Sequence, residues 1–149
     1  MSPDRPTQLI DRFDRRISYL RLSVTDRCDF RCQYCMAETM DFLPRSEVLT
    51  IEELLRTARL FTELGVRKIR VTGGEPLIRR GVHELFEGLG ALAGLDSLAL
   101  TTNGSQLADS GHALRDAGVN SINISLDSLQ AKRFKAITRI GDLNTVLRG

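Results

Sequence analysis

The chain contains three cysteines, Cys28, Cys32 and Cys35, and all of them lie within one stretch of eight residues. Their spacing, C-x3-C-x2-C, lets one short loop wrap three thiolates around a single iron–sulfur cluster. A four-iron cube held by three protein ligands keeps one iron open to a small molecule. The cysteines therefore predict a redox-active cluster with a vacant corner for chemistry rather than a pure electron carrier.

Two other interpretations of the cysteines stay open from the spacing alone. A structural zinc site of the Cys3His type would take His83 or His112 as its fourth ligand. Three incidental buried cysteines are a weaker alternative, because these residues are clustered after an expected strand. An odd number of cysteines in so short a segment does not suit a secreted disulfide framework and fits a reducing cytoplasm.

A glycine-rich turn, Thr72-Gly73-Gly74-Glu75-Pro76, follows the second expected strand. Paired glycines allow backbone N–H and C=O groups to approach a ligand closely. The carboxylate of Glu75 would stand at the same rim, where it suits the ammonium group of a ligand. Taken alone the turn is also an ordinary chain reversal. Beside a three-cysteine loop on the neighbouring strand, it indicates a binding site.

The elements that must position these motifs alternate along the chain. Strands are expected at 17–25, 67–72, 97–102 and 121–126, and helices at 51–64, 81–92, 106–117 and near 129–137. The βαβαβαβα order predicts a parallel sheet with right-handed crossovers. Residues 1–16 are expected to form an N-terminal arm that is disordered over residues 1–6, and residues 17–149 are expected to be the N-terminal part of one α/β domain.

The strands also show an alternation of apolar and polar side chains. Leu22 and Val71 represent the apolar face, whereas Arg21 and Arg70 represent the polar face. A parallel sheet covered by helices on both faces should be apolar on both. We therefore expect a partial (βα) barrel in which the apolar face meets outer helices and the polar face lines a ligand-filled interior. The inward positions include Arg21, Arg70, Thr101 and Ser125.

The length and composition limit the possible functions. The chain has 149 residues, of which 42% are hydrophobic and 27% charged, as in ordinary soluble globular proteins. Its formal net charge of +2 gives no argument for a nucleic-acid or membrane partner. The sequence contains no apolar run of ~18 residues, as a membrane span would need, and no secretory signal. Four βα units are too few for a closed barrel of ~250 residues, so a truncated domain or fragment with an open sheet edge is expected.

The cysteine and glycine motifs together resemble those of the radical S-adenosylmethionine (radical SAM) enzymes. From Tyr19 onward the sequence is similar to the GTP 3′,8-cyclase family of molybdenum cofactor biosynthesis, a family of lyases. The resemblance is carried by residues 19–28, the cysteine loop, residues 68–79, Thr101-Thr102-Asn103-Gly104 and residues 123–128. The last two stretches, and the residues around the arginines in the other stretches, are specific to the cyclase family.

This resemblance implies a [4Fe-4S] cluster on Cys28, Cys32 and Cys35, with S-adenosylmethionine on the open iron. One electron would cleave the sulfonium to a 5′-deoxyadenosyl radical, which takes hydrogen from C3′ of GTP before C3′ joins C8. The residues implied to bind S-adenosylmethionine are Tyr34, Gly73, Gly74, Glu75 and Ser125. Those implied to bind GTP are Arg21, Arg70 and Thr101.

The implied partners are GTP, a reducing electron donor, a second copy in a homodimer and the downstream cyclic pyranopterin monophosphate synthase. The family chain is about twice as long, and its C-terminal half carries a second three-cysteine cluster for the GTP base, further strands and a Gly-Gly tail. This chain is therefore expected to assemble the first cluster, whereas full cyclisation would need the remaining half. A radical SAM enzyme with another substrate and a zinc-stabilised binding module remain the alternatives.

Overall fold

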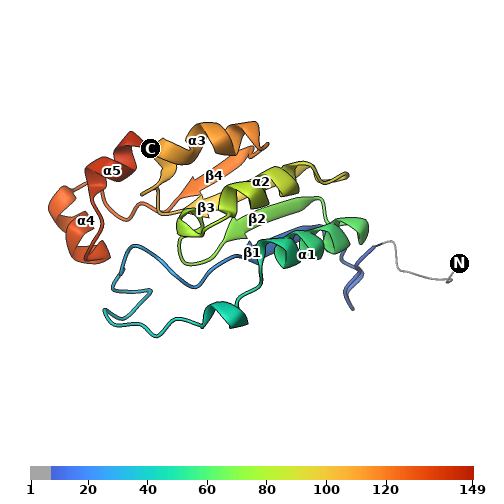
Figure 1. The fold of residues 1–149 in the computed structure, drawn as a ribbon, viewed down its shortest axis with the longest axis horizontal. Coiled ribbons are helices and arrows are strands. Elements are labelled where there is room, and N and C mark those ends of the chain that lie inside the picture. The colour runs from blue at the N-terminus through green and yellow to red at the C-terminus, as the bar shows by residue number, and fades with distance from the viewer. Residues whose placement is uncertain (1–7) are drawn as a thin grey trace, which may run out of the picture.

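A parallel four-stranded sheet forms the centre of the computed structural model, which describes residues 8–149 (Figure 1). The strands are β1 (Tyr19–Ser23), β2 (Lys68–Thr72), β3 (Ser97–Thr102) and β4 (Ser121–Ile124), and they lie side by side in this order. All four expected strands are confirmed, although the first and last are shorter than expected. Since every strand runs in the same direction, their carboxyl ends meet at one rim of the sheet.

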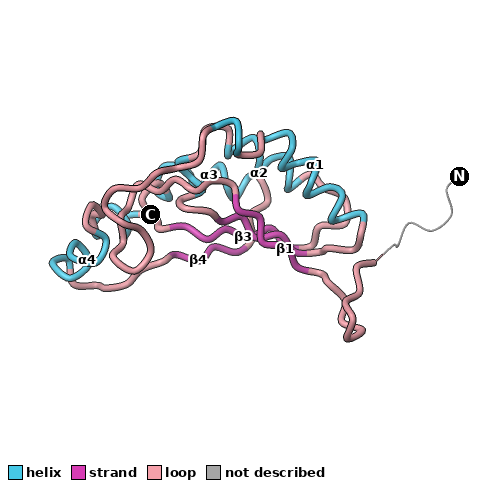
Figure 2. The backbone as a smooth tube through the Cα atoms, turned by 90° about the horizontal axis from the view of Figure 1, so that it is seen from below, coloured by secondary structure: helices cyan, strands magenta, loops and turns pink. Residues whose placement is uncertain are grey.

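The helices and short 3-10 turns follow the predicted alternation. They are η1 (Arg45–Glu47), α1 (Ile51–Glu63), η2 (Pro76–Ile78), α2 (Val82–Gly90), α3 (Leu107–Asp116), α4 (Ala131–Thr138) and α5 (Leu143–Arg148). Helices α1, α2 and α3 cover one face of the sheet, and the opposite face carries no helix (Figure 2). Helices α4 and α5 lie beyond the carboxyl ends of the strands (Figure 1). None of the helices within residues 8–149 has the length and apolarity to span a membrane.

The start of α1 is fixed by a reciprocal pair of hydrogen bonds. The Glu53 backbone N–H donates to Thr50 Oγ1 at 3.2 Å, and the Thr50 backbone N–H donates to Glu53 Oε2 at 2.8 Å. This capping box satisfies two N–H groups that would otherwise lack partners in the first turn. It ends the long segment that carries the cysteines and begins the helix that covers β1 and β2.

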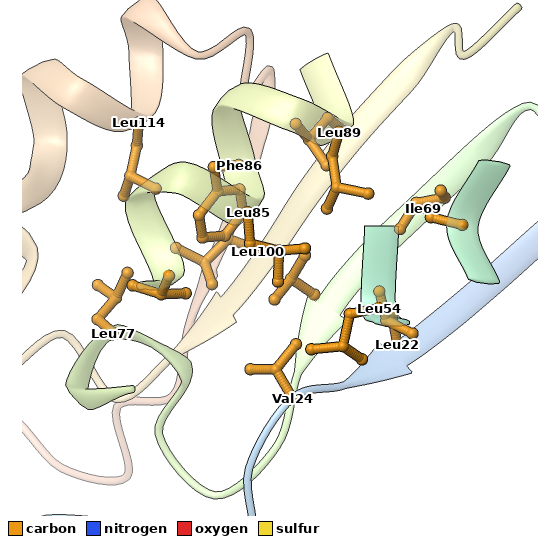
Figure 3. Packing of buried hydrophobic residues seen from close by; sticks show 14 of the residues in the cluster. Leu22, Val24, Leu54, Ile69, Leu77, Leu85, Phe86, Leu89, Leu100 and Leu114 are labelled. Atoms are coloured by element: carbon orange, nitrogen blue, oxygen red, sulfur yellow. The ribbon is translucent and has the colours of Figure 1, made fainter. Parts of the chain in front are cut away.

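The main apolar core lies between the sheet and helices α1 to α3 (Figure 3). Leu22, Val71 and Leu100 occupy matching register positions on the three strands β1, β2 and β3. Phe86 and Leu89 of α2 pack onto this face and are fully buried. The expectation of one apolar, helix-covered face is therefore confirmed for these three strands, and the sheet is open rather than closed into a barrel.

Strand β4 departs from the expected pattern. Ile122 and Ile124, which should face covering helices, remain 38% and 43% exposed. The expectation is wrong here because α4, the helix that follows β4, does not fold back over the sheet. It packs at the rim against the cysteine-containing segment, so the edge of the sheet stays uncovered.

A second apolar cluster joins the rim to the end of the chain. It consists of Phe30, Phe134, Leu143 and Val146, and Cys28 and Cys32 pack against it. The rings of Phe30 and Phe134 meet edge to face, with their centroids 5.9 Å apart. This cluster brings the cysteine loop, α4 and α5 together, although Phe30 and Phe134 are far apart in the sequence.

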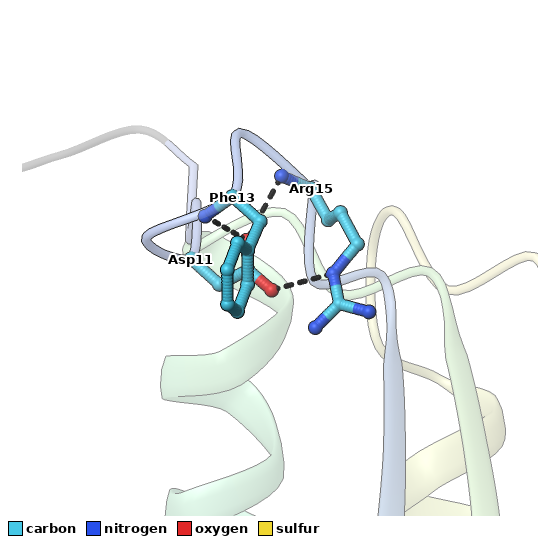
Figure 4. A network of polar contacts seen from close by, with 3 residues as sticks. All are labelled: Asp11, Phe13 and Arg15. Carbon is cyan, nitrogen blue, oxygen red and sulfur yellow. Dashed lines mark hydrogen bonds and ion pairs between the residues drawn. The ribbon is translucent and has the colours of Figure 1, made fainter.

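The part of the N-terminal arm that the structure describes is a hairpin closed by a bridge between Ile10 and Arg16. The start of the arm, for which disorder is expected, lies in residues 1–7, outside the described residues. The Asp11 carboxylate accepts hydrogen bonds from the backbone N–H groups of Phe13 and Arg15 at 2.8 and 3.0 Å (Figure 4). It also pairs with Arg15 Nε at 2.7 Å. Leu9 N–H donates to the carbonyl of Leu64 at 3.1 Å, which ties the hairpin to the end of α1.

Candidate active site at the carboxyl ends of the strands

The three cysteines lie in the segment that follows β1, at the rim where the strands end. All three thiols are free; Cys28 and Cys32 are half-buried and Cys35 is exposed. The carbonyl of Cys32 accepts hydrogen bonds from the backbone N–H groups of Cys35 and Met36 at 2.9 and 3.0 Å. The second and third cysteines are therefore joined by a single hydrogen-bonded turn.

The local environment of Cys28 and Cys32 favours the protonated thiol when no metal is present. Burial is the main cause of a raised pKa for both thiols, and the neighbouring carboxylates and thiolates add to it. The backbone N–H of Phe30, 3.4 Å from Cys28 Sγ, acts in the opposite direction. Bound iron would displace the protons and remove the mutual repulsion of the thiolates. The donor set therefore fits a cationic cluster.

The zinc alternative needs several metal-binding side chains around one ion. Within residues 8–149, no three His, Cys, Asp or Glu side chains converge closely enough to hold one ion. A zinc site of the Cys3His type, with His83 or His112, thus has no support among the described residues. A four-iron cube differs from it in taking each thiolate on a different iron.

The carboxyl end of α4 holds the cysteine loop through backbone contacts. The N–H of Arg31 donates to the carbonyl of Thr138 at 3.1 Å, and the N–H of Gln33 donates to that of Ile137 at 3.0 Å. The side-chain amide of Gln33 donates to the carbonyl of Ala136 at 2.9 Å. The last carbonyls of α4, which have no partner within the helix, are thereby satisfied by the loop.

Arg139 adds a clamp directly after α4. Its guanidinium donates to the carbonyls of Arg31 and Met36, both at 3.0 Å, on the two sides of the Cys32–Cys35 turn. Its Nε also lies 3.3 Å from a carboxylate oxygen of Glu38. The residue has φ of 61°, an uncommon value for a non-glycine residue. The role of Arg139 was not predicted from the sequence, because nothing in the local sequence indicates that α4 packs against the cysteine loop.

The paired glycines bring the glycine-rich turn against the cysteine segment. Gly74 N–H donates to the carbonyl of Thr25 at 2.7 Å, and Glu75 N–H donates to that of Arg27 at 2.8 Å. A Cβ atom at Gly74 would overlap the backbone carbonyl of Arg27, and Gly73 has φ of 152°. The close approach predicted for these glycines is therefore made, in this structure, to the protein backbone.

The Glu75 carboxylate is buried within the protein, whereas the sequence predicts that it faces a ligand at the rim. Its side chain is fully buried, and its carboxylate accepts hydrogen bonds from Leu77 N–H at 3.0 Å, Thr102 Oγ1 at 2.8 Å and Asn103 N–H at 2.6 Å. Burial raises the pKa of this carboxyl, and the three hydrogen bonds oppose that shift. The carboxylate is thus not open to a ligand's ammonium group; it joins the glycine-rich turn to the end of β3.

Tyr34 and Ser125 stand at the same rim. The Tyr34 side chain is 69% exposed, and its hydroxyl donates to the Asp127 carboxylate, with oxygen distances of 3.0 and 3.2 Å. Partial burial and this hydrogen bond raise the pKa of Tyr34. Ser125 N–H donates to the carbonyl of Thr102 at 2.8 Å, which fixes the exit of β4 beside that of β3. Asp127 was not predicted to have a role, although it positions Tyr34.

The uncovered face of the sheet carries two neighbouring arginines. Arg21 and Arg70 are register partners on β1 and β2, and Arg70 also bonds to Tyr19 Oη at 3.1 Å and Thr101 Oγ1 at 3.2 Å. Within residues 8–149, neither guanidinium has a carboxylate within ion-pair distance. Two like charges on strands ~4.8 Å apart repel each other, and an anion would relieve that repulsion.

A family model described as the radical SAM superfamily matches residues 22–149. The chain belongs to the radical SAM superfamily. This family uses a [4Fe-4S] cluster and S-adenosylmethionine, and the three free thiols of this chain lie together in the segment that follows β1.

Several GTP 3′,8-cyclases are similar to this radical SAM chain. The protein of Saccharophagus degradans is 62% identical over 141 residues, covering 95% of this chain and 43% of the relative. The protein of Pseudomonas entomophila is 58% identical over 144 residues, covering 97% and 43%. That of Marinobacter nauticus is 60% identical over 143 residues, covering 96% and 43%. The chain thus spans less than half the length of these relatives.

Two solved structures share the fold at low sequence identity. The structure of Streptococcus suis SuiB bound to precursor peptide SuiA matches with a TM-score of 0.65 and 18% identity, over 83% of this chain and 27% of that one. BtrN in complex with AdoMet and 2-DOIA matches with a TM-score of 0.56 and 15% identity, over 88% and 54%. These similarities confirm the α/β class and the arrangement of parallel strands with outer helices.

Proposed function

We propose that this chain provides the cluster-binding and nucleotide-binding part of a GTP 3′,8-cyclase in molybdenum cofactor biosynthesis. The whole reaction converts GTP to (8S)-3′,8-cyclo-7,8-dihydroguanosine 5′-triphosphate. One observation carries the proposal: three free thiols lie at the carboxyl rim of the sheet, and its uncovered face carries two guanidinium groups that have no ion-pair partner among residues 8–149. The similarity to cyclases over 95% of the chain supports the choice of reaction.

Cys28, Cys32 and Cys35 would hold the cluster, and the loop would be kept in place by α4. When bound, the cluster and S-adenosylmethionine supply a one-electron cleavage that yields a 5′-deoxyadenosyl radical. Tyr34, Gly74 and Ser125 are assigned to S-adenosylmethionine. Gly73 and Glu75 belong to the same site through the shape of the turn, since the Glu75 side chain is engaged with β3 and is fully buried.

Arg21, Arg70 and Thr101 would bind the triphosphate of GTP. Guanidinium groups can grip phosphate oxygens in a bidentate manner, and they keep their charge at any working pH. Thr101 Oγ1 lies 3.2 Å from the Arg70 guanidinium and so orients it across the open face. Binding of the triphosphate would neutralise two charges that have no carboxylate partner among residues 8–149.

The proposed partners follow from the chemistry of this site. The cluster needs a one-electron donor, and the cyclised triphosphate would pass to cyclic pyranopterin monophosphate synthase. A homodimer belongs to the proposal as well. Three reduced thiols are best preserved in the cytoplasm, where we place the reaction.

The proposal is tested first by anaerobic reconstitution of the chain. It should yield a brown protein with about four irons per chain that cleaves S-adenosylmethionine when reduced. A colourless chain that binds only zinc would contradict the proposal and favour a structural metal site.

Binding of GTP then tests the substrate. Arg21→Ala and Arg70→Ala should each weaken GTP binding about tenfold or more, because a hydrogen bond to a charged group contributes about 1.5–3 kcal/mol. Arg56→Ala is the matched control, since Arg56 is exposed on α1 and away from the open face. Equal affinity in all three variants would favour a radical SAM enzyme with another substrate.

A further inference from the structure

Asn103 lies at the end of β3 and makes a contact with a cysteine that sequence reasoning did not anticipate. Its side-chain nitrogen, Nδ2, is 3.8 Å from Cys28 Sγ and 2.7 Å from Asp29 Oδ1. An amide NH₂ has two hydrogens, so one N–H can bond to the carboxylate while the other points at the sulfur. Asn103 is therefore placed to donate to an iron ligand without itself binding iron.

The orientation of this amide is fixed from several directions. Asn103 Oδ1 accepts a hydrogen bond from Ser105 N–H at 2.8 Å, which identifies the opposite side of the amide as the nitrogen. Ser105 Oγ donates to Asp29 Oδ2 at 2.6 Å and so holds the carboxylate that holds the amide. The Asn103 backbone N–H donates to the buried Glu75 at 2.6 Å. A flipped amide would lose the Asp29 bond and the Ser105 bond together.

We propose that Asn103 is a positioning residue that tunes the cluster through an N–H···S hydrogen bond to the Cys28 ligand. Hydrogen bonds to the sulfurs of an iron–sulfur cluster are among the factors that set its reduction potential. Reduction adds negative charge to the cluster and its thiolates, and an N–H donor stabilises the reduced state more than the oxidised state. Asn103 thus makes the cluster easier to reduce. The inference rests on the cluster assignment and on no property of the substrate.

The same contacts connect the sulfur to the rest of the rim. Asn103 bonds to Glu75 through its backbone and to Asp29 and Cys28 through its side chain. The glycine-rich turn, the end of β3 and the first cysteine therefore share one hydrogen-bond network. Loss of the amide would take one hydrogen-bond partner from the Asp29 carboxylate and one from the Ser105 N–H as well as from the sulfur, so iron content must be compared together with the potential.

The test compares the reduction potentials of reconstituted clusters by redox titration followed with electron paramagnetic resonance. Asn103→Ala should decrease the equilibrium constant for reduction of the cluster by up to about tenfold. This corresponds to a reduction potential lower by up to ~59 mV for a one-electron couple. Asn103→Asp should lower it further, since it keeps an oxygen for Ser105 N–H and places a carboxylate near the sulfur. Asn144→Ala, an exposed asparagine on α5, is the matched control and should leave the potential unchanged.

A second measurement detects the contact between the amide and the cluster directly. In the unsubstituted chain, asparagine labelled with ¹⁵N in its side chain should show a hyperfine coupling to the reduced cluster, and Asn103→Ala should abolish it. A missing coupling, or an Asn103→Ala cluster with full iron content and an unchanged potential, overturns the inference. Iron content is measured first: an unsubstituted chain that assembles no cluster overturns the proposed function itself, whereas a cluster without GTP binding leaves this inference standing.

Discussion

The two apolar clusters of the molecule differ in size and in the structural elements that they join. The large one fills the space between the sheet and α1, α2 and α3, and its buried residues are aliphatic apart from Phe86. The small one has four buried residues and is surrounded by hydrogen bonds from the cysteine loop to α4 and Arg139. The first stabilises the sheet, and the second stabilises the loop that carries the chemistry.

This difference separates the stability of the fold from the stability of the site. A region with few buried apolar contacts opens locally at a lower free energy than the whole domain unfolds. Helices α4 and α5 pack on the loop and on each other, and α5 also contacts α3, so their detachment would leave most of the main core covered. We expect the cysteine loop to open and close as a unit with α4 and α5.

The largest expected effect comes from a pair of matched aromatic truncations. Phe86→Ala should lower the free energy of global unfolding by about 3–5 kcal/mol, the usual cost of a large cavity in a packed core. Phe134→Ala removes an equally buried ring, since Phe134 is 1% exposed and Phe86 is 0% exposed. The loss of stability in Phe134→Ala should nevertheless not exceed the free energy needed to detach α4. Urea unfolding monitored by circular dichroism measures both variants.

The matched pair also predicts opposite effects on the site. Phe134→Ala should reduce the amount of iron that the chain retains, whereas Phe86→Ala should retain iron up to the urea concentration at which the whole fold is lost. Equal losses of global stability in the two variants would show that the clusters form one cooperative unit.

Much of the fold could be predicted because the relevant signals are local. The alternation in β1 to β3 identified the covered face, and the helix expected at 51–64 begins at Ile51, directly after the Thr50 cap. The cysteine spacing identified a metal-binding loop from eight consecutive residues. Each of these patterns depends on neighbours within a turn or a strand, where side-chain direction follows directly from backbone geometry.

The rest depends on contacts between residues far apart in the sequence. Ile124 has the right parity for a buried position, but its burial depended on where α4 would pack. Glu75 has a suitable charge for a ligand, but the hydroxyl of Thr102 and the N–H of Asn103 occupy it. In the sequence Arg139 resembles an ordinary surface charge after a helix. In the structure its guanidinium donates to carbonyls on both sides of the Cys32–Cys35 turn. The local pattern of apolar and polar residues does not indicate any of these distant partners.

An intermediate effect is expected at Arg139. Arg139→Ala removes both hydrogen bonds to the loop and should cost about 1.5–3 kcal/mol of local stability, the range for a charged donor. Arg139→Gly removes the same side chain and relieves the positive φ, so it should cost less. Amide exchange at Arg31 and Gln33 measures the opening of the loop.

Lysine and a neighbouring arginine provide the controls for this site. Arg139→Lys keeps the charge but lacks the planar guanidinium that directs Nη1 to the two carbonyls while Nε faces Glu38, and it should behave more like Arg139→Ala than like the parent. Arg133→Ala, on the exposed side of α4, should leave exchange at the loop unchanged. Unchanged protection of Arg31 and Gln33 in Arg139→Ala would mean that the backbone pairing with α4 alone holds the loop.

The smallest expected effect is a pH dependence confined to the end of the chain. Asp142 caps α5, and its carboxylate accepts hydrogen bonds from Thr145 Oγ1 at 2.7 Å and Thr145 N–H at 2.9 Å. These bonds lower the pKa of Asp142 below its ordinary value of 3.8. The stabilisation is therefore complete above pH 3.8 and is lost as the pH falls through the lower folded-state pKa.

Protection of the Thr145 amide against exchange should accordingly decrease below pH 3.8, while the amides of β2 and β3 keep their protection over the same range. Asp142→Asn should retain the cap and remove this pH dependence, because asparagine accepts the same hydrogen bond without titrating in this range. Asp142→Ala should lose the cap at every pH. If protection in β2 fell together with that of Thr145, the acid sensitivity would belong to the whole fold, and the small cluster would have no separate stability.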